Sequence, residues 1–198
     1  MLQRFAECLA VLCLLTTTTT AGERPNILWL SCEDISAHLG CYGDDLATTP
    51  QLDAFAKQSV RYSHAFVTAG VCAPCRSAVI TGMYQTSIGT QHMRCTAQLP
   101  KSIQPFTMRL RKAGYYCTNN SKTDYQFRHP RETWDASSGK AHWKHRPEGA
   151  PFFAVFNYTG CHESGIASNS KYNQVATGIK RHDRSVTAAT LPPYYPDT

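Results

Sequence analysis

The chain contains 198 residues, of which 42% are hydrophobic and 17% are charged, which predicts one globular domain with a core and excludes a disordered chain. The formal net charge is +6, but the basic residues are scattered and only residues 140–146 form a dense basic patch. A solvated loop or an anionic small substrate explains this patch better than a nucleic-acid surface, so we expect no nucleic-acid partner.

The N-terminal residues resemble a secretory signal. Arg4 precedes an apolar stretch over residues 9–15, which is followed by a threonine run and by Ala21, after which cleavage is expected. The apolar stretch is too short to span a bilayer as a helix. We therefore expect a signal peptide at residues 1–21, secretion or periplasmic export, and no stable membrane insertion. A buried or disordered N-terminal segment is the alternative.

The cysteines give a second indication of chemistry. The chain has nine, and two of them lie in the expected signal, which leaves seven. An odd number in an exported chain leaves at least one thiol without an intrachain partner. The spacing is irregular, and a chain of this length does not need a disulfide framework. One of these cysteines is therefore a candidate for a chemical role.

The first predicted element is a buried strand in residues 25–34, PNILWLSCED. The segment is apolar through Leu30 and ends at Glu33 and Asp34, which places two carboxylates after the strand. In open α/β sheets the carboxyl ends of the strands are where ligands bind.

Two helices and a short strand are predicted next. Pro50 stands near the first position of a helix, and apolar residues continue at helical spacing as far as Val60. Residues 61–67, RYSHAFV, are a strand candidate. Residues 72–82 predict the second helix, with a proline in its first turn and Gly82 at its end.

The second half of the chain predicts a helix over residues 106–112 that is stopped by Gly114. A strand is predicted within residues 114–120, and the clearest buried strand covers residues 151–159. Residues 163–198 have little periodicity and predict loop. Strands that alternate with helices imply an α/β fold with a mainly parallel sheet flanked by helices.

The stretch VCAPCRSAVITGMY, residues 71–84, permits three interpretations. Cys72 and Cys75 enclose a proline at a predicted helix start, which resembles the C-x-P-C motif of thioredoxin-like oxidoreductases, where the helix lowers a thiol pKa. A zinc site is the second interpretation, since another pair, His92 and Cys95, follows at ligand-like spacing. The apolar segment between the pairs disfavours zinc, and a disulfide oxidoreductase stays the alternative.

The third interpretation accounts for more residues. Cys72, Pro74 and Arg76 are followed by a hydrophobic residue and a Thr-Gly pair, and this pattern resembles the sulfatase signature C-x-P-S/C-R. The resemblance implies that a formylglycine-generating or sulfatase-maturating enzyme oxidises Cys72 to formylglycine. The hydrated aldehyde would attack the sulfur of the substrate and displace the alcohol, with Arg76 steadying its oxygen. It also implies an alkaline-phosphatase-like fold.

Other segments resemble the same family, from about Pro25 to the end of the chain. Glu33 and Asp34 stand where sulfatases carry acidic metal ligands, which implies a divalent cation, most simply Ca²⁺. Lys122 stands in the segment that carries a catalytic lysine and would hold the sulfate. His162 follows the strand that delivers a catalytic histidine and would protonate the leaving oxygen.

The finer resemblance is to carbohydrate sulfatases, including those near the heparan N-sulfatase group. It rests on residues 82–94, GMYQTSIGTQHMR, and on residues 141–146, AHWKHR. It implies a sulfated carbohydrate substrate, and we expect His92 and Asp124 to contact it. Asp124 stands where many members have His. Glu33 stands where most have Asp, a change that preserves a carboxylate oxygen for a hard cation.

Length is the largest departure from the family pattern, because sulfatases are much longer. Residues 24–198 resemble the N-terminal part of their catalytic domain, so we expect an incomplete domain here. A non-catalytic remnant is a further alternative. The sequence leaves open whether a sulfate ester or a sulfamate would be cleaved.

Overall fold

The computed structural model describes residues 24–177 and Pro196. The predicted signal peptide, residues 1–21, lies outside the described residues. The part of the predicted loop 163–198 that follows residue 177 also lies outside them, apart from Pro196. Within the described ranges, no helix is long and apolar enough to cross a membrane.

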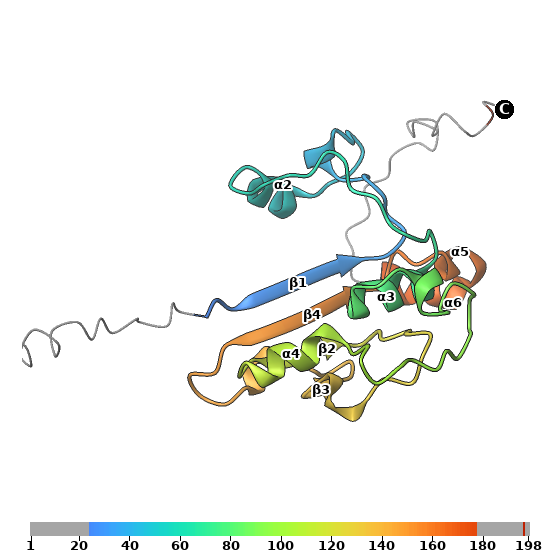
Figure 1. The fold of residues 1–198 in the computed structure, drawn as a ribbon. Coiled ribbons are helices and arrows are strands. Elements are labelled where there is room, and N and C mark those ends of the chain that lie inside the picture. Colours follow the sequence, from blue (N-terminus) through green and yellow to red (C-terminus); the bar gives the residue numbers. More distant parts are fainter. Residues whose placement is uncertain (1–23, 178–195, 197–198) are drawn as a thin grey trace, which may run out of the picture.

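A four-stranded sheet forms the centre of the described fold, and all its strand pairs are parallel (Figure 1). In spatial order the strands are β1 (Ile27–Cys32), β4 (Phe152–Tyr158), β2 (Tyr116–Asn120) and β3 (Ala136–Ser137). The register pairs Cys32, the last residue of β1, with Tyr158, and the last residue of β2 with Phe156. The strands therefore end at one edge of the sheet. The predicted α/β class is confirmed, and so are the strands predicted within residues 114–120 and 151–159.

Helices α3 and α4 lie over one face of this sheet (Figure 1). The helices are α2 (Pro50–Ala56), α3 (Cys72–Thr81), α4 (Phe106–Lys112), α5 (Ser164–Ala167) and α6 (Asn169–Ala176). Short 3₁₀ turns lie between them: η1 (Gly40–Tyr42), η2 (Gln85–Ser87), η3 (Arg131–Thr133) and η4 (Trp143–His145). On the other face, Trp143 of η4 stacks on Phe152 with ring centroids 5.0 Å apart.

The helices predicted over residues 72–82 and 106–112 are confirmed, together with the glycines expected to end them. Helix α3 begins at Cys72, and Gly82 follows its end in the left-handed region at φ 68°. Helix α4 ends at Lys112, shortly before Gly114 at φ 88°. Glycine adopts this conformation without the cost that a Cβ would impose.

Phe153 of β4 lies at the centre of the hydrophobic core. Its ring packs edge-on against Phe106, with centroids 5.4 Å apart, and lies parallel to Trp134 at 6.1 Å. Cys117 of β2 and Ile80 of α3 belong to the same buried cluster. This core joins α3 firmly to the sheet, which fixes where the first residue of α3 lies.

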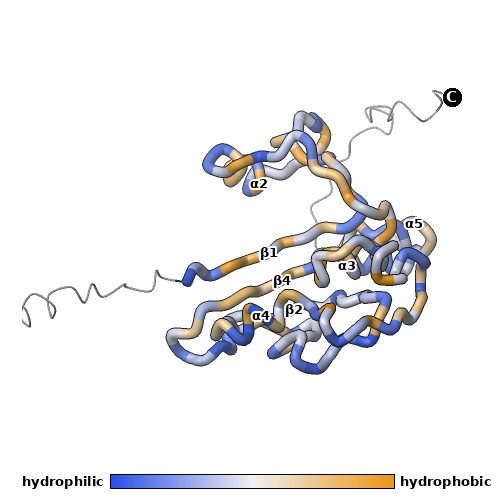
Figure 2. Tube along the Cα trace, viewed as in Figure 1, coloured by the Kyte–Doolittle hydropathy of each residue, from blue (hydrophilic) through white to orange (hydrophobic). Residues whose placement is uncertain are grey.

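The prediction that residues 25–34 form a buried strand is wrong in one respect. The strand exists as β1, but Leu28 is 53% exposed and Leu30 is 64% exposed. Figure 2 shows the apolar character along β1 and β4. The reason for the exposure is that β1 is the edge strand of the described sheet and pairs only with β4. Helix α2 lies apart from β1 (Figure 1).

Three further expectations are corrected. Residues 61–67 form no strand, and Phe66 is 88% exposed, because no strand in the described part of the chain lies beside them to pair. The helix after Pro50 ends at Ala56 rather than near Val60. Within the predicted loop that begins at residue 163, the structure forms α5 and α6. Helix α6, NSKYNQVA, is mostly polar and buries no residue, so its sequence gives only a weak helix signal.

Candidate active site

Three loops and one helix start meet at the carboxyl edge of the sheet. Glu33 and Asp34 follow β1, Lys122 and Asp124 follow β2, and His162 follows β4. Cys72 is the first residue of α3, which packs over the same sheet. The parallel register therefore gathers six residues that the sequence analysis selected, although they are spread over 130 positions.

A continuous set of contacts links the cysteine to the histidine. The Cys72 Sγ donates to Asp124 Oδ2 at 3.3 Å, and the same oxygen lies 3.7 Å from Lys122 Nζ. The Lys122 ammonium contacts both carboxylate oxygens of Glu33, at 2.7 and 2.9 Å. Finally, His162 Nε2 lies 3.6 Å from Glu33 Oε2. Basic side chains and carboxylates thus alternate between Cys72 and His162.

Both thiols of the C-x-P-C stretch have raised pKa values and are therefore less readily deprotonated. Burial raises the pKa of Cys72, the hydrogen bond to Asp124 raises it further, and the nearby Lys122 charge opposes both effects. Burial also raises the pKa of Cys75, against the influence of Arg76. Dithiol redox chemistry needs a lowered thiol pKa. The raised pKa values of both thiols therefore disfavour the oxidoreductase interpretation.

The zinc interpretation is not supported within residues 24–177. The one group of at least three possible metal ligands among the described residues is Glu33, Asp34 and His162. The Cys72 sulfur faces Asp124, and the Cys95 sulfur faces the carbonyl oxygen of Gly89 at 3.6 Å. The two cysteine-containing pairs therefore do not assemble.

Within the Glu33, Asp34 and His162 group, the two carboxylates fit the cation that the resemblance implies. The ligand atoms of the group all lie within 4.8 Å of one another. Two carboxylates are the ligand type that calcium prefers, whereas an imidazole suits transition metals better. Asp34 is held in place by the Glu163 backbone N–H, which donates to Oδ2 at 3.1 Å. The acidic pair after β1 is therefore arranged as the start of a hard-cation site.

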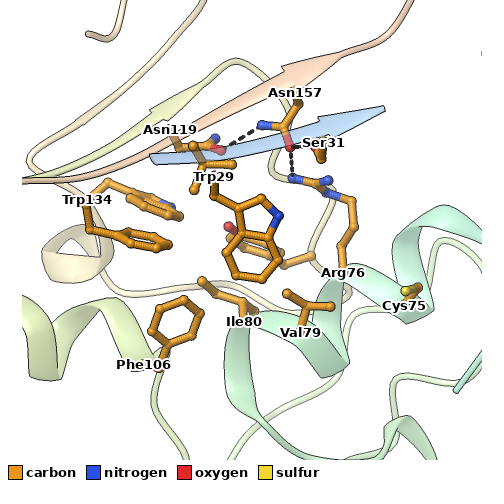
Figure 3. Close-up of a pocket in the computed structure, with 13 residues that line it drawn as sticks. Trp29, Ser31, Cys75, Arg76, Val79, Ile80, Phe106, Asn119, Trp134 and Asn157 are labelled. Atoms are coloured by element: carbon orange, nitrogen blue, oxygen red, sulfur yellow. Dashed lines mark hydrogen bonds between the residues drawn. The ribbon is translucent and has the colours of Figure 1, made fainter. Parts of the chain in front are cut away.

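Arg76 does not contact Cys72 among the interactions of the described residues. Its Nε donates to the carbonyl oxygen of Thr123 at 2.9 Å, and its Nη2 donates to the Lys122 carbonyl and to Asn157 Oδ1 at 3.0 Å. Figure 3 shows the side chain reaching from α3 to Asn157 on β4. Arg76 therefore fixes the loop that carries Lys122 and Asp124.

Asn157 completes this support, and the sequence analysis missed it. Its Nδ2 donates to Asn119 Oδ1 at 3.0 Å, while its Oδ1 accepts from Ser31 and from Arg76 (Figure 3). One buried amide thus ties β1, β2 and α3 to β4. The available signal was a polar residue inside the apolar strand FFAVFNY.

An apolar cavity of about 190 Å³ lies behind Arg76, between α3 and the sheet. Trp29, Phe106 and Phe153 are among its lining residues (Figure 3). None of the residues that form the charged contacts between Cys72 and His162 lines it. The cavity is therefore separate from the charged site.

His92, expected to contact substrate, has no hydrogen bond or ion pair to its ring among the described residues. Its backbone carbonyl instead accepts from Cys95 N and from Gln126 Nε2. The residue of this turn that reaches the site is Arg94, whose Nη1 lies 2.6 Å from Asp124 Oδ1. No periodicity or motif spacing singled out Arg94.

Comparison with known proteins agrees with this geometry. The family model described as Sulfatase matches residues 25–155. An ulvan-active sulfatase from Formosa agariphila is 47% identical over 171 residues, which cover 80% of this chain and 29% of that protein. Iduronate 2-sulfatase from Mus musculus is 41% identical over 63 residues, which cover 32% of this chain and 11% of that protein. The chain thus spans less than a third of the length of these relatives.

Solved structures show the same fold. A protein in complex with its substrate D-glucosamine-2-N,6-O-disulfate has a TM-score of 0.62 and 20% identity, and the match covers 75% of this chain and 38% of that one. A 2-O GAG sulfatase also has a TM-score of 0.62, with 18% identity, and the match covers 88% of this chain and 42% of that one. The alkaline-phosphatase-like fold expected from the sequence is confirmed over the part that this chain covers.

Proposed function

The chain belongs to the sulfatase family, and from this premise we propose that it hydrolyses sulfate esters of a carbohydrate, with Cys72 oxidised to formylglycine as the nucleophilic residue. The observation that carries the proposal is the position of Cys72. It opens α3 at the carboxyl edge of the sheet, 3.3 Å from Asp124 and connected through Lys122 and Glu33 to His162. The carbohydrate class is supported by relatives named as ulvan-active and iduronate sulfatases.

Two groups that the family implies would complete the site. Glu33 and Asp34 would hold a calcium ion, which would draw negative charge from the sulfate oxygens when bound. Oxidation of Cys72 would require a partner enzyme that generates formylglycine, and it would supply an oxygen nucleophile in place of a protonated thiol. Export through the signal peptide at residues 1–21 is part of the same proposal.

The chain's own residues supply binding and proton transfer. The backbone N–H groups in the first turn of α3, a helix of ten residues, favour an anion beside position 72. Lys122 provides a positive charge for the sulfate. Asp124, already an acceptor for the side chain at position 72, is placed to take a proton from an oxygen there.

His162 is placed to donate a proton to the alcohol oxygen as the bond between that oxygen and sulfur breaks. Its Nδ1 lies 2.7 Å from the carboxylate of Glu163 and 2.8 Å from the hydroxyl of Ser164. These contacts orient the ring and leave Nε2 facing Glu33 at 3.6 Å. The nitrogen that faces the site is therefore the one available for proton donation.

Sulfate release by protein purified from its own host tests the proposal. We expect release of inorganic sulfate from a sulfated polysaccharide or its sugars. Cys72→Ala should lower the rate by at least about a thousandfold, as loss of a nucleophile does, and calcium chelation should lower it as well. Cys75→Ser is the matched control and should remain active, because the Cys75 side chain is not one of those that link Cys72 to His162. A wild-type protein that carries formylglycine at position 72 and calcium but releases no sulfate would contradict the proposal and leave a non-catalytic member of the family.

A further inference from the structure

The turn that carries Arg94 is built into the fold beside the proposed nucleophile. The His92 carbonyl accepts from Gln126 Nε2, and the Gln126 backbone N–H donates to the Ser77 hydroxyl of α3 at 2.9 Å. A parallel bridge also joins Ala97 to Phe127, with Ala97 N donating to the Gln126 carbonyl at 2.8 Å. The turn is therefore fixed to α3 and to the segment that follows Asp124.

Arg94 and Asp124 form an ion pair on the far side of Asp124 from Cys72. One carboxylate oxygen, Oδ1, lies 2.6 Å from Arg94 Nη1, while the other accepts from the Cys72 thiol at 3.3 Å. The Asp124 side chain is 16% exposed and that of Arg94 is 70% exposed. Arg94 thus stands at the solvent side of the site, one carboxylate away from the reacting position.

Both partners adopt strained backbone conformations. The described residues other than glycine with positive φ are Asp34, Ser36, Arg94, Ser121 and Asp124. Arg94 is at φ 60° and Asp124 at φ 50°. Asp34 and Asp124 belong to the site. Ser36 and Ser121 lie within two residues of a site residue in the sequence, and Arg94 forms an ion pair with Asp124. Strain of this kind gathers at ligand-binding positions.

Stability alone does not account for this arrangement. A non-glycine residue in the left-handed region carries a conformational cost. An ion pair with a largely exposed arginine contributes little to stability. The pair therefore does not offset the strain of the two residues that form it, and a role in binding explains why an arginine stands here.

We propose that Arg94 binds a second anionic group of the sugar, a carboxylate or a further sulfate, next to the sulfate that is cleaved. The inference rests on the proposed function. Only Nη1 of Arg94 has a partner among the described residues, so the rest of its planar fork is open to solvent and suits either anion. Because Asp124 occupies one edge of the fork, the guanidinium stays oriented while the other edge receives the substrate.

Calorimetric binding to Cys72→Ala protein, which has no nucleophile at position 72, tests the inference. The probes are a neutral hexose monosulfate, a uronic acid monosulfate and a hexose disulfate. We expect the two dianionic sugars to bind about tenfold more tightly than the neutral-sugar monosulfate. Arg94→Gly, in which glycine accepts the left-handed conformation, should bind all three sugars with affinities equal to within about twofold of one another, and a tenfold preference that persists in this variant would overturn the inference. Arg94→Asn, which also tolerates that conformation, is the second variant, and Arg128→Ala is the charge-matched control on an exposed arginine outside the site.

Each outcome has a defined meaning. Preference for the uronic acid alone assigns Arg94 to a carboxylate, and preference for the disulfate alone assigns it to a second sulfate. Equal binding of all three sugars, unchanged in both Arg94 variants, overturns the inference and leaves the proposed function standing. Failure to bind any of the three overturns the proposed function and the inference with it.

Discussion

The sulfur of Cys72 lies 3.3 Å from Oδ2 of Asp124 and donates to it, although the two residues are 52 positions apart. The contact places a carboxylate where many sulfatases carry a histidine. It joins the start of α3 to the loop after β2, and Lys122 of the same loop continues the chain of charges to Glu33. The proposed reaction depends on this junction.

Asp124→Asn should lower the pKa of the Cys72 thiol in protein that retains the cysteine. The carboxylate raises this pKa by accepting the thiol hydrogen and by its charge, and Lys122 opposes it. With the carboxylate removed, the Lys122 charge acts without that opposition, while burial still raises the pKa. The midpoint of iodoacetamide alkylation at Cys72 should therefore move to lower pH. Glu148→Gln, the same change at an exposed residue, should leave the midpoint unchanged, and equal midpoints in all three proteins would contradict the account.

Lys122→Met should destabilise the chain by about 1–3 kcal/mol, because Glu33 would keep a largely buried carboxylate without its partner. The Lys122 and Glu33 side chains are 17% and 9% exposed, so solvent screens this pair less than a surface pair. Urea unfolding measures the loss. The double variant with Glu33→Gln should lose less than the sum of the two single changes. Additive losses, or an equal loss in the exposed control Lys140→Met, would show that the pair is not coupled.

Phe153→Ala should cost about 3–5 kcal/mol of unfolding free energy, because it opens a cavity between Phe106 and Trp134. Leu30→Ala is the contrasting control on the adjacent strand. Since Leu30 is 64% exposed in the chain, its truncation should cost less than about 1 kcal/mol. Chemical denaturation compares the two variants. A loss at Leu30 as large as that at Phe153 would mean that β1 is covered in solution.

Cys117 should make the fold sensitive to alkali. Burial, with a smaller contribution from Asp135, raises the pKa of Cys117 from 9.0 to about 12. Above pH 9 the unfolded chain loses the thiol proton while the folded chain keeps it, so stability is full below about pH 9 and falls as the pH rises toward 12. Cys117→Ala should therefore be less stable at pH 7 but lose less stability between pH 8 and pH 11. Parallel stability curves for the two proteins would refute this.

Local patterns predicted the elements that support the site. The apolar runs of β1, β2 and β4 and the stop signals Gly82 and Gly114 are readable because each depends on neighbouring residues. The exposure of β1 was not readable, because it depends on which strand lies beside it. The strand expected at residues 61–67 failed for the same reason, since a strand needs a partner as well as β-forming residues.

For the site, the acidic pair, Lys122, His162 and Cys72 were predicted, and the parallel register brings them together. Arg76 was expected at the nucleophile, whereas the structure shows it bonded to the 122–123 backbone and to Asn157. Arg94 was missed because its position depends on a left-handed backbone conformation, which cannot be predicted from the sequence at a residue other than glycine. Contacts between loops that are distant in the sequence depend on the whole fold, so the spacing of residues within a motif does not predict them.

Peptide mass spectrometry of residues 71–84, on protein purified from its own host, is the most direct test of the central claim. The account predicts that position 72 has lost its sulfur and carries an aldehyde, which would react with a hydrazide probe. A free thiol at position 72 throughout the purified protein would contradict the claim that formylglycine is the nucleophile, and a disulfide between Cys72 and Cys75 that cycles with reductant would restore the oxidoreductase interpretation.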